Sequence, residues 1–192
     1  MKDAIFMGIN FQQFADLNSI GIFLLFLFTI KIIVLFNLKK YKHYFKQISY
    51  DDYMWGIILI LIISIVGANM YAYIWGDYPC ELCWYQRVLI YPMLILAASE
   101  LYFKTRVAHK FIAVLSVMTF LLASYHYYNH FMKYVLGKAV IMPCSQASGL
   151  PNCADAIVSY GFVTMPLMSA VVAFFLITVM VIINKVYGKR ID

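Results

Sequence analysis

The chain has 192 residues, of which 64% are apolar and only 12% are charged, and its mean hydropathy is +0.80. A soluble domain is closer to half apolar and a quarter charged, so this composition excludes soluble, disordered, fibrous and small secreted proteins. The net charge of +6 does not indicate nucleic-acid binding, because Lys and Arg cluster in short segments beside apolar ones. The sequence therefore predicts a polytopic membrane protein.

Five apolar segments are predicted to cross the membrane as helices, which makes the fold class all-α. In chain order they cover residues 19–36, 55–75, 84–103, 108–128 and 164–186, joined by segments 37–54, 76–83, 104–107 and 129–163. No segment alternates apolar and polar residues, as strands of a membrane barrel would. The first segment is expected to remain as a helix, because it lacks the basic start and the small-residue cleavage site of a signal peptide.

The distribution of Lys and Arg predicts the orientation in the membrane. Ten basic residues flank one side: Lys39, Lys40, Lys42, Lys46, Lys104, Arg106, Lys110, Lys185, Lys189 and Arg190. The other side has only Lys2, Lys133 and Lys138. Because basic segments stay in the cytoplasm, the N-terminus is expected outside and the C-terminus inside the cell.

The four cysteines are Cys80, Cys83, Cys144 and Cys153, and this topology places all of them at the outer membrane face. Disulfides persist in such an oxidising location. A disulfide within the pair Cys80-x-x-Cys83 closes a very small ring and constrains the unfolded chain little, which favours redox cycling over stapling. Cys83 is expected to begin a helix, where the positive end of the helix dipole stabilises a thiolate.

Arg87 follows Cys83 by four residues and so lies on the same helical face, one turn deeper. It could hold a thiolate ionised or donate a hydrogen bond to the carbonyl of a lipid-soluble ligand. Alternatively, it could extend to lipid headgroups, or pair with Glu81 or Asp77. The spacing alone leaves these alternatives open.

The second pair, Cys144 and Cys153, encloses a polar segment rich in turn-forming residues. It could be a structural staple, or it could exchange disulfides with the first pair, since both lie on one membrane face. Zinc is disfavoured, because structural sites use two closely spaced pairs and an oxidising compartment opposes four free thiolates. No metal is predicted.

His126 and His130 lie one helical turn apart near the outer end of the fourth segment. They could contact a flat aromatic ligand, donate a proton to it, or anchor the helix at the membrane interface. A metal site is less favoured, because no carboxylate and no third histidine is close in the sequence.

Several motifs in this order resemble the DsbB/BdbC family of membrane thiol–disulfide oxidoreductases, and most of all its short-loop BdbC members. They are the run PCELCWYQR at 79–87, Tyr91-Pro92, His126-Tyr127, Cys144, Cys153 and the run YGFVTMP at 160–166. The resemblance covers residues 55–186. It implies a four-helix catalytic bundle at 55–192. Residues 1–54 depart from the family and are expected to form an additional N-terminal transmembrane helix and a basic cytoplasmic connector.

The resemblance also implies a quinone, either ubiquinone or menaquinone, bound near the outer surface. Cys83 would lie next to the quinone with Cys80 as its disulfide partner, and Arg87 would contact the quinone. Either His126 or His130 would face its ring.

By the same resemblance, Cys144 would react with a reduced thioredoxin-like extracytoplasmic oxidase such as DsbA or BdbD, and Cys153 would pass the electrons inward. The expected function is quinone-linked reoxidation of that partner in a bacterial plasma membrane. Two alternatives stay open: a reductase like the vitamin K epoxide reductases, or a non-enzymatic membrane protein with two structural disulfides.

Overall fold

A computed structural model of the chain describes residues 9–76, 78–134, 136–138, 153, 158–160 and 162–188. The elements are α1 (Phe11–Asn37), α2 (Lys42–Gln47), α3 (Tyr50–Tyr73), α4 (Glu81–Phe103), α5 (Ala108–Tyr134), β1 (Val158–Ser159), β2 (Val163–Thr164) and α6 (Met165–Tyr187). Five of the helices are long and apolar enough to cross a membrane. The predicted all-α, multi-pass architecture is therefore confirmed, with one short antiparallel strand pair added between α5 and α6.

Capping side chains set the starts of α1 and α3, which come earlier than hydropathy predicts. Helix α1 begins at Phe11 and not at residue 19 because Asn10 Oδ1 accepts from the backbone N–H of Gln13 at 2.8 Å, while Gln13 Oε1 accepts from that of Asn10 at 3.0 Å. Ser49 and Asp52 make the same reciprocal capping box at the start of α3. Each box satisfies N–H groups that a helix start leaves without partners.

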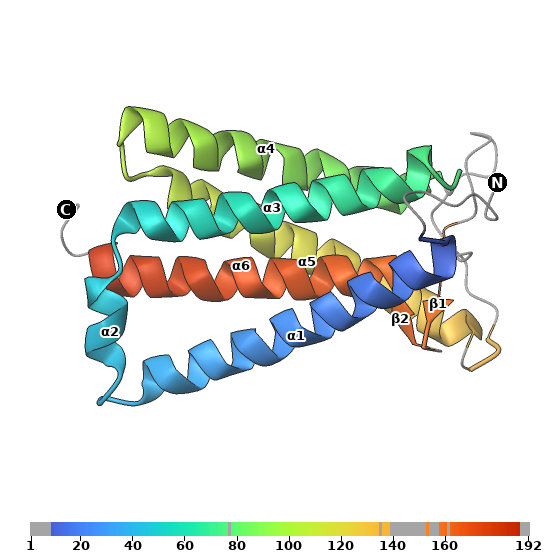
Figure 1. Cartoon of the computed structure of the whole chain (residues 1–192), viewed down its shortest axis with the longest axis horizontal. Coiled ribbons are helices and arrows are strands. Elements are labelled where there is room, and N and C mark those ends of the chain that lie inside the picture. Colours follow the sequence, from blue (N-terminus) through green and yellow to red (C-terminus); the bar gives the residue numbers. More distant parts are fainter. Residues whose placement is uncertain are drawn as a thin grey trace.

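Helix α6 is the most buried of the five and packs against α1, α3 and α5 (Figure 1). Helix α4 packs against α3 and α5. The core of this bundle is apolar and draws on four helices, with Met54, Leu61, Met93, Ile112, Leu176 and Ile183 each fully or almost fully buried. Helix α1 exposes Leu17, Phe23, Leu24 and Phe28 over about half or more of their surface, as a helix in contact with lipid does.

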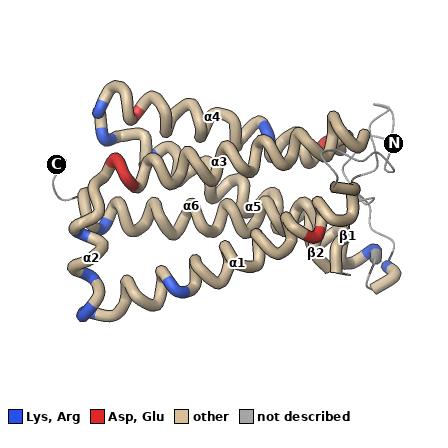
Figure 2. Tube along the Cα trace, in the orientation of Figure 1, with Lys and Arg blue, Asp and Glu red and all other residues tan. Residues whose placement is uncertain are grey.

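Most of the charged residues that the structure describes lie at one end of the bundle, around α2 and the α4–α5 connection (Figure 2). There Glu100, which is 2% exposed, accepts from the backbone N–H groups of Val107 at 3.1 Å and Ala108 at 2.8 Å. A buried carboxylate at this position satisfies donors at the start of α5 and complements the helix dipole. The start of α4 and the β1–β2 pair lie at the opposite end (Figure 1).

Candidate functional site

The C-x-x-C motif forms the first turn of α4. Cys80 is the N-cap residue, and the backbone N–H of Trp84 donates to its carbonyl at 3.0 Å. The helix was predicted to begin at residue 84 with Cys83 at its start, but it begins at Glu81. Both sulfurs therefore lie at the positive end of the helix dipole, where unpaired N–H groups favour a thiolate.

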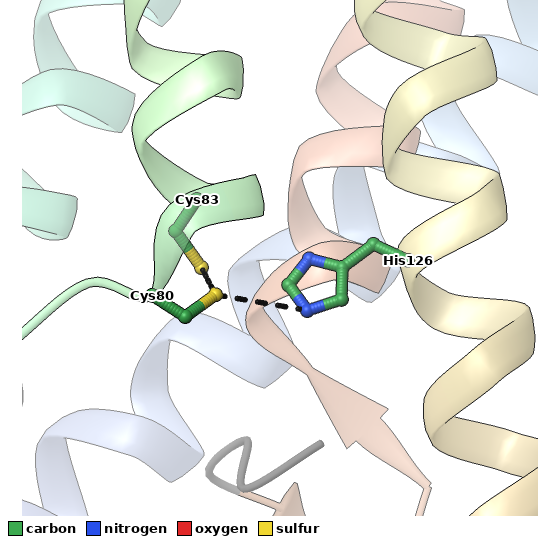
Figure 3. Close-up of side chains that lie close together, drawn as sticks. All are labelled: Cys80, Cys83 and His126. Atoms are coloured by element: carbon green, nitrogen blue, oxygen red, sulfur yellow. Dashed lines mark hydrogen bonds between the residues drawn. The ribbon is translucent and has the colours of Figure 1, made fainter. Parts of the chain in front are cut away.

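The two thiols of this motif are close to each other and to His126 (Figure 3). Both cysteines are in the dithiol form, with a hydrogen bond of 3.1 Å joining the two sulfurs. Nε2 of His126 lies 3.9 Å from Cys80 Sγ. The hydrogen bond with Cys83 and, after it, the interaction with His126 lower the pKa of Cys80 to about 5, although its burial opposes this shift. The two sulfurs share one hydrogen bond at the start of the helix, and the thiolate expected at Cys83 stays a prediction.

His126 contacts three other residues of the site, namely Cys80, Gln86 and Cys153. It projects from α5 and is 1% exposed. Its Nε2 lies 2.9 Å from the carbonyl oxygen of Cys153, and its Nδ1 lies 3.3 Å from Nε2 of Gln86. A carbonyl can only accept, so Nε2 carries a proton in the contact with Cys153.

Cys153 is disulfide-bonded and is 1% exposed. It packs in one apolar cluster with Cys80, Leu82, Cys83 and Leu122. The chain segment that contains Cys153 therefore brings one member of the second cysteine pair against the C-x-x-C motif. Its predicted partner, Cys144, lies outside the described residues.

Arg87 turns into the bundle toward α3. It is 8% exposed, and its Nη2 donates to the carbonyl of Ala68 at 2.9 Å while its Nη1 donates to Asn69 Oδ1 at 3.4 Å. The guanidinium also lies 5.3 Å from the centre of the Trp84 ring. These contacts favour the inward position of Arg87 over an extended position among lipid headgroups.

A pocket of about 180 Å³ lies beside these residues. Cys80, Cys83 and Cys153 line it, together with Arg87 and His126, and apolar side chains from α1, α3, α4 and α6 complete its walls. A cavity of about 150 Å³ is known to admit one benzene ring, so this pocket has the size for a single planar ring. The pocket thus places an apolar, ring-sized space directly against the sulfurs.

The structure brings together Cys80, Cys83, Arg87, His126 and Cys153 of the predicted site residues. His130 is buried at 4% exposure but is not among the described residues that line the pocket.

Sequence reasoning missed Gln86, Asn69 and Asn18, of which Gln86 and Asn18 line the pocket and Asn69 binds Arg87. Two signals could have found Gln86 and Asn69. Gln86 lies three residues after Cys83, on the same helical face. A polar residue within an apolar membrane segment, such as Asn69, is itself a mark of a functional position. Asn18 carries no such mark, because it lies just before the segment predicted at 19–36.

The sulfur atoms of Cys80 and Cys83 and a ring nitrogen of His126 lie within 4.8 Å of one another, close enough to bind one metal ion. Within the described part of the chain this gives three ligands, whereas a closed structural zinc site needs four.

Comparison with known proteins places the chain among disulfide bond formation proteins. The family described as "Disulfide bond formation protein DsbB" matches residues 51–183. The "Disulfide bond formation protein C" of Bacillus subtilis (strain 168) is 32% identical over 134 residues, which are 69% of this chain and 92% of that protein. A "Probable disulfide formation protein" of Coxiella burnetii (strain Dugway 5J108-111) is 31% identical over 77% of this chain and 93% of its own length.

No solved structure matches the chain. The family match covers α3 to most of α6, including the C-x-x-C motif and the pocket walls that these helices provide, and it leaves out α1 and α2. The chain therefore belongs to the DsbB family of disulfide bond formation proteins and is a multi-pass membrane thiol–disulfide oxidoreductase.

Proposed function

We propose that this protein uses a membrane quinone to reoxidise a thioredoxin-like dithiol oxidase of the DsbA or BdbD type. One observation carries this proposal: Cys80, Cys83 and Cys153 line the same ring-sized apolar pocket. A series of cysteine pairs that ends at such a pocket can pass electrons to an acceptor dissolved in the lipid. A water-soluble thiol buffer cannot reach that acceptor.

The charge distribution supports an orientation in which the cysteines face the outside of a bacterial plasma membrane. Most Lys and Arg residues gather at the end with α2, and the C-x-x-C motif is at the other end (Figures 1 and 2). Basic segments are retained on the cytoplasmic side. The dithiol partner would therefore reach the site from the oxidising compartment.

The pocket residues fit a quinone, either ubiquinone or menaquinone. The walls are largely apolar, and Arg87 supplies fixed N–H donors of the kind that recognise a ring carbonyl. A bound quinone accepts two electrons and two protons and leaves as the quinol. By its place in the motif, Cys83 is the sulfur that passes these electrons on, and Arg87 orients the acceptor one helical turn deeper.

The electrons would enter at the second cysteine pair by thiol–disulfide exchange. A partner thiolate bonds to Cys144 and releases Cys153, and the second partner thiolate then displaces Cys144 and leaves the partner oxidised. The Cys153 thiolate next bonds to Cys80 of the oxidised motif and releases Cys83 as a thiolate. Cys144 finally displaces Cys80 from Cys153, so that two electrons have moved to the C-x-x-C pair. The packing of Cys153 against Cys80 supports this order.

The low pKa of Cys80 supplies the driving force for this inward step. A disulfide whose reduced form is stabilised as a thiolate is more oxidising, because reduction gains that stabilisation. His126 stabilises the thiolate directly, and Gln86 holds the histidine ring in the orientation that does so. The pair can therefore take electrons from Cys144 and Cys153 and yield them to an acceptor of higher potential.

Stopped-flow measurement of quinone reduction tests this proposal, with the purified full chain in lipid nanodiscs and a reduced thioredoxin-like partner as donor. Cys83→Ser is expected to abolish quinone reduction. Cys144→Ser is expected to block the partner while the C-x-x-C pair still reacts with small dithiols. Full turnover of the partner by Cys144→Ser would refute the two-pair relay.

The same assay separates the alternatives. Electron flow from a quinol to the partner would indicate a reductase like the vitamin K epoxide reductases. Cysteines inert toward both quinone and partner would indicate structural disulfides.

A further inference from the structure

Helix α1 lies outside the part of the chain that matches the DsbB family, yet it is fixed beside the pocket. Its first turns pack on the end of α3 through aromatic rings. Phe14 lies 5.1 Å from the ring centre of Tyr71 and 4.7 Å from that of Trp75, and Phe11 contacts both rings edge-on. Such aromatic pairs add stability beyond the area that they bury. This cluster holds the next two turns of α1 against the pocket wall.

Two side chains of α1, Asn18 and Ile22, line the pocket directly. They are one helical turn apart and so share a face of α1. Asn18 Nδ2 donates to the carbonyl of Phe14 at 2.9 Å and to the hydroxyl of Tyr71 at 3.3 Å. Tyr71, which is 3% exposed, lines the same pocket.

Gly67 on α3 marks where the two helices approach each other. A Cβ atom at this position would lie 3.8 Å from Asn18 Oδ1, so the amide of Asn18 rests over the glycine. Gly67, Ala68 and Asn18 all line the pocket, and Ala68 supplies the carbonyl that binds Arg87. The amide of Asn18 and the guanidinium of Arg87 therefore approach the same stretch of α3.

We propose that α1 forms an additional wall of the quinone pocket and that Asn18 and Ile22 contact the bound quinone and set its affinity. Ile22 contributes apolar contact, and Asn18 contributes the only amide group that α1 directs to the pocket among the described lining residues. This inference rests on the proposed function, because it assigns further residues to the same ligand.

A matched pair of substitutions on α1 tests the proposal in the full chain. Ile22→Trp places a large ring in the pocket, whereas Phe23→Trp places the same ring at the next position, where the side chain is 60% exposed. The first measurement is the Kd of a short-tailed quinone by calorimetry in nanodiscs. The second is steady-state quinone reduction with dithiothreitol as electron donor, which separates KM from kcat.

Ile22→Trp is expected to raise both Kd and KM at least about tenfold with little change in kcat, because a filled pocket loses binding and not thiol chemistry. Phe23→Trp is expected to leave both within about twofold. Asn18→Leu, which keeps the volume and removes the amide, is expected to raise Kd about threefold to tenfold, as for one lost hydrogen bond.

The Kd values of these variants support or refute the role of α1. Equal Kd values for the wild type, Ile22→Trp and Asn18→Leu would refute the role of α1. If Ile22→Trp unfolds, Ile22→Ala replaces it, because the smaller side chain cannot clash; this variant is expected to weaken binding about threefold or more by lost apolar contact. A wild type that binds no quinone would instead refute the proposed function itself, and this inference with it.

Discussion

His126 is expected to control how readily Cys80 ionises. The pKa of Cys80 is about 5, whereas its ordinary value is 9.0, so the reduced protein should carry a thiolate at Cys80 throughout the neutral range. The hydrogen bond with Cys83 makes the larger contribution and His126 the smaller one. His126→Phe should therefore raise the pKa of Cys80, and Cys83→Ala should raise it further.

The same substitution should change the redox potential of the C-x-x-C pair, with a size that can be worked out. One pKa unit corresponds to about 1.36 kcal/mol, and about 30 mV to about 1.4 kcal/mol for two electrons, so each unit should lower the potential by about 30 mV. At pH 7 the fall cannot exceed about 60 mV, because a thiol whose pKa lies above 7 is no longer ionised there. The potential follows from equilibration with glutathione or a dithiol buffer.

The pKa itself follows from the pH dependence of Cys80 alkylation by iodoacetamide, quantified by mass spectrometry. The folded pKa is below the ordinary value, so the rate should be high above pH 5 and should fall as the pH drops through 5. His130→Phe is the matched control, since His130 lies one helical turn away and should leave the midpoint unchanged. A wild-type midpoint near 9, or one midpoint shared by wild type and His126→Phe, would show that the contact in Figure 3 does not stabilise the thiolate.

Two further predictions concern the pocket and the opposite end of the bundle. Arg87→Ala should raise the quinone KM about 10- to 100-fold, as expected for loss of a charge-assisted hydrogen bond, and should leave Cys80 alkylation unchanged; an unchanged KM would show that Arg87 does not contact the quinone. Glu100→Gln should lower the stability by about 1–3 kcal/mol in a thermal or denaturant unfolding assay, because its buried carboxylate accepts from Val107 and Ala108. Glu100→Gln should keep the wild-type quinone KM, because Glu100 and the pocket lie at opposite ends of the bundle. A raised KM would contradict the expectation that Glu100 does not affect the pocket.

Hydropathy predicts that the five helices exist, because the length of an apolar run is set by the thickness of the bilayer. It does not predict where α1 begins. Gln12, Gln13 and Asp16 lower the local hydropathy, but these residues belong to the first turns of a helix that Asn10 caps. The start of α4 is misplaced for the same reason, because Glu81 lowers the local hydropathy although it belongs to the first turn of the helix.

Spacing within one helix predicts part of the site, since Cys83 and Arg87 lie on one face of α4. Contacts between helices could not be predicted in this way. Each spanning helix is apolar on all sides, so the sequence does not show which face of a helix packs against which other helix. For this reason the contact of Arg87 with Ala68 leaves no periodic signal in the sequence, and neither does the position of α1 beside the pocket. Polar residues inside apolar spans are the exception, and Asn69 is of this kind, whereas Asn18 lies just before the span predicted at 19–36.

The start of α4 joins two kinds of chemistry that need different surroundings. Thiol–disulfide exchange needs an ionised sulfur that a protein partner or a second cysteine pair can approach, and the N-cap position of Cys80 beside Cys153 meets this need. A lipid-soluble acceptor needs an apolar site with a fixed donor. Arg87 lies seven residues after Cys80, which is about 10 Å along a helix at 1.5 Å per residue. Because both groups belong to one helix, the spacing between the sulfur end and Arg87 is set by the helix itself, and a thiol reaction at the first turn leaves the donor one turn deeper in place.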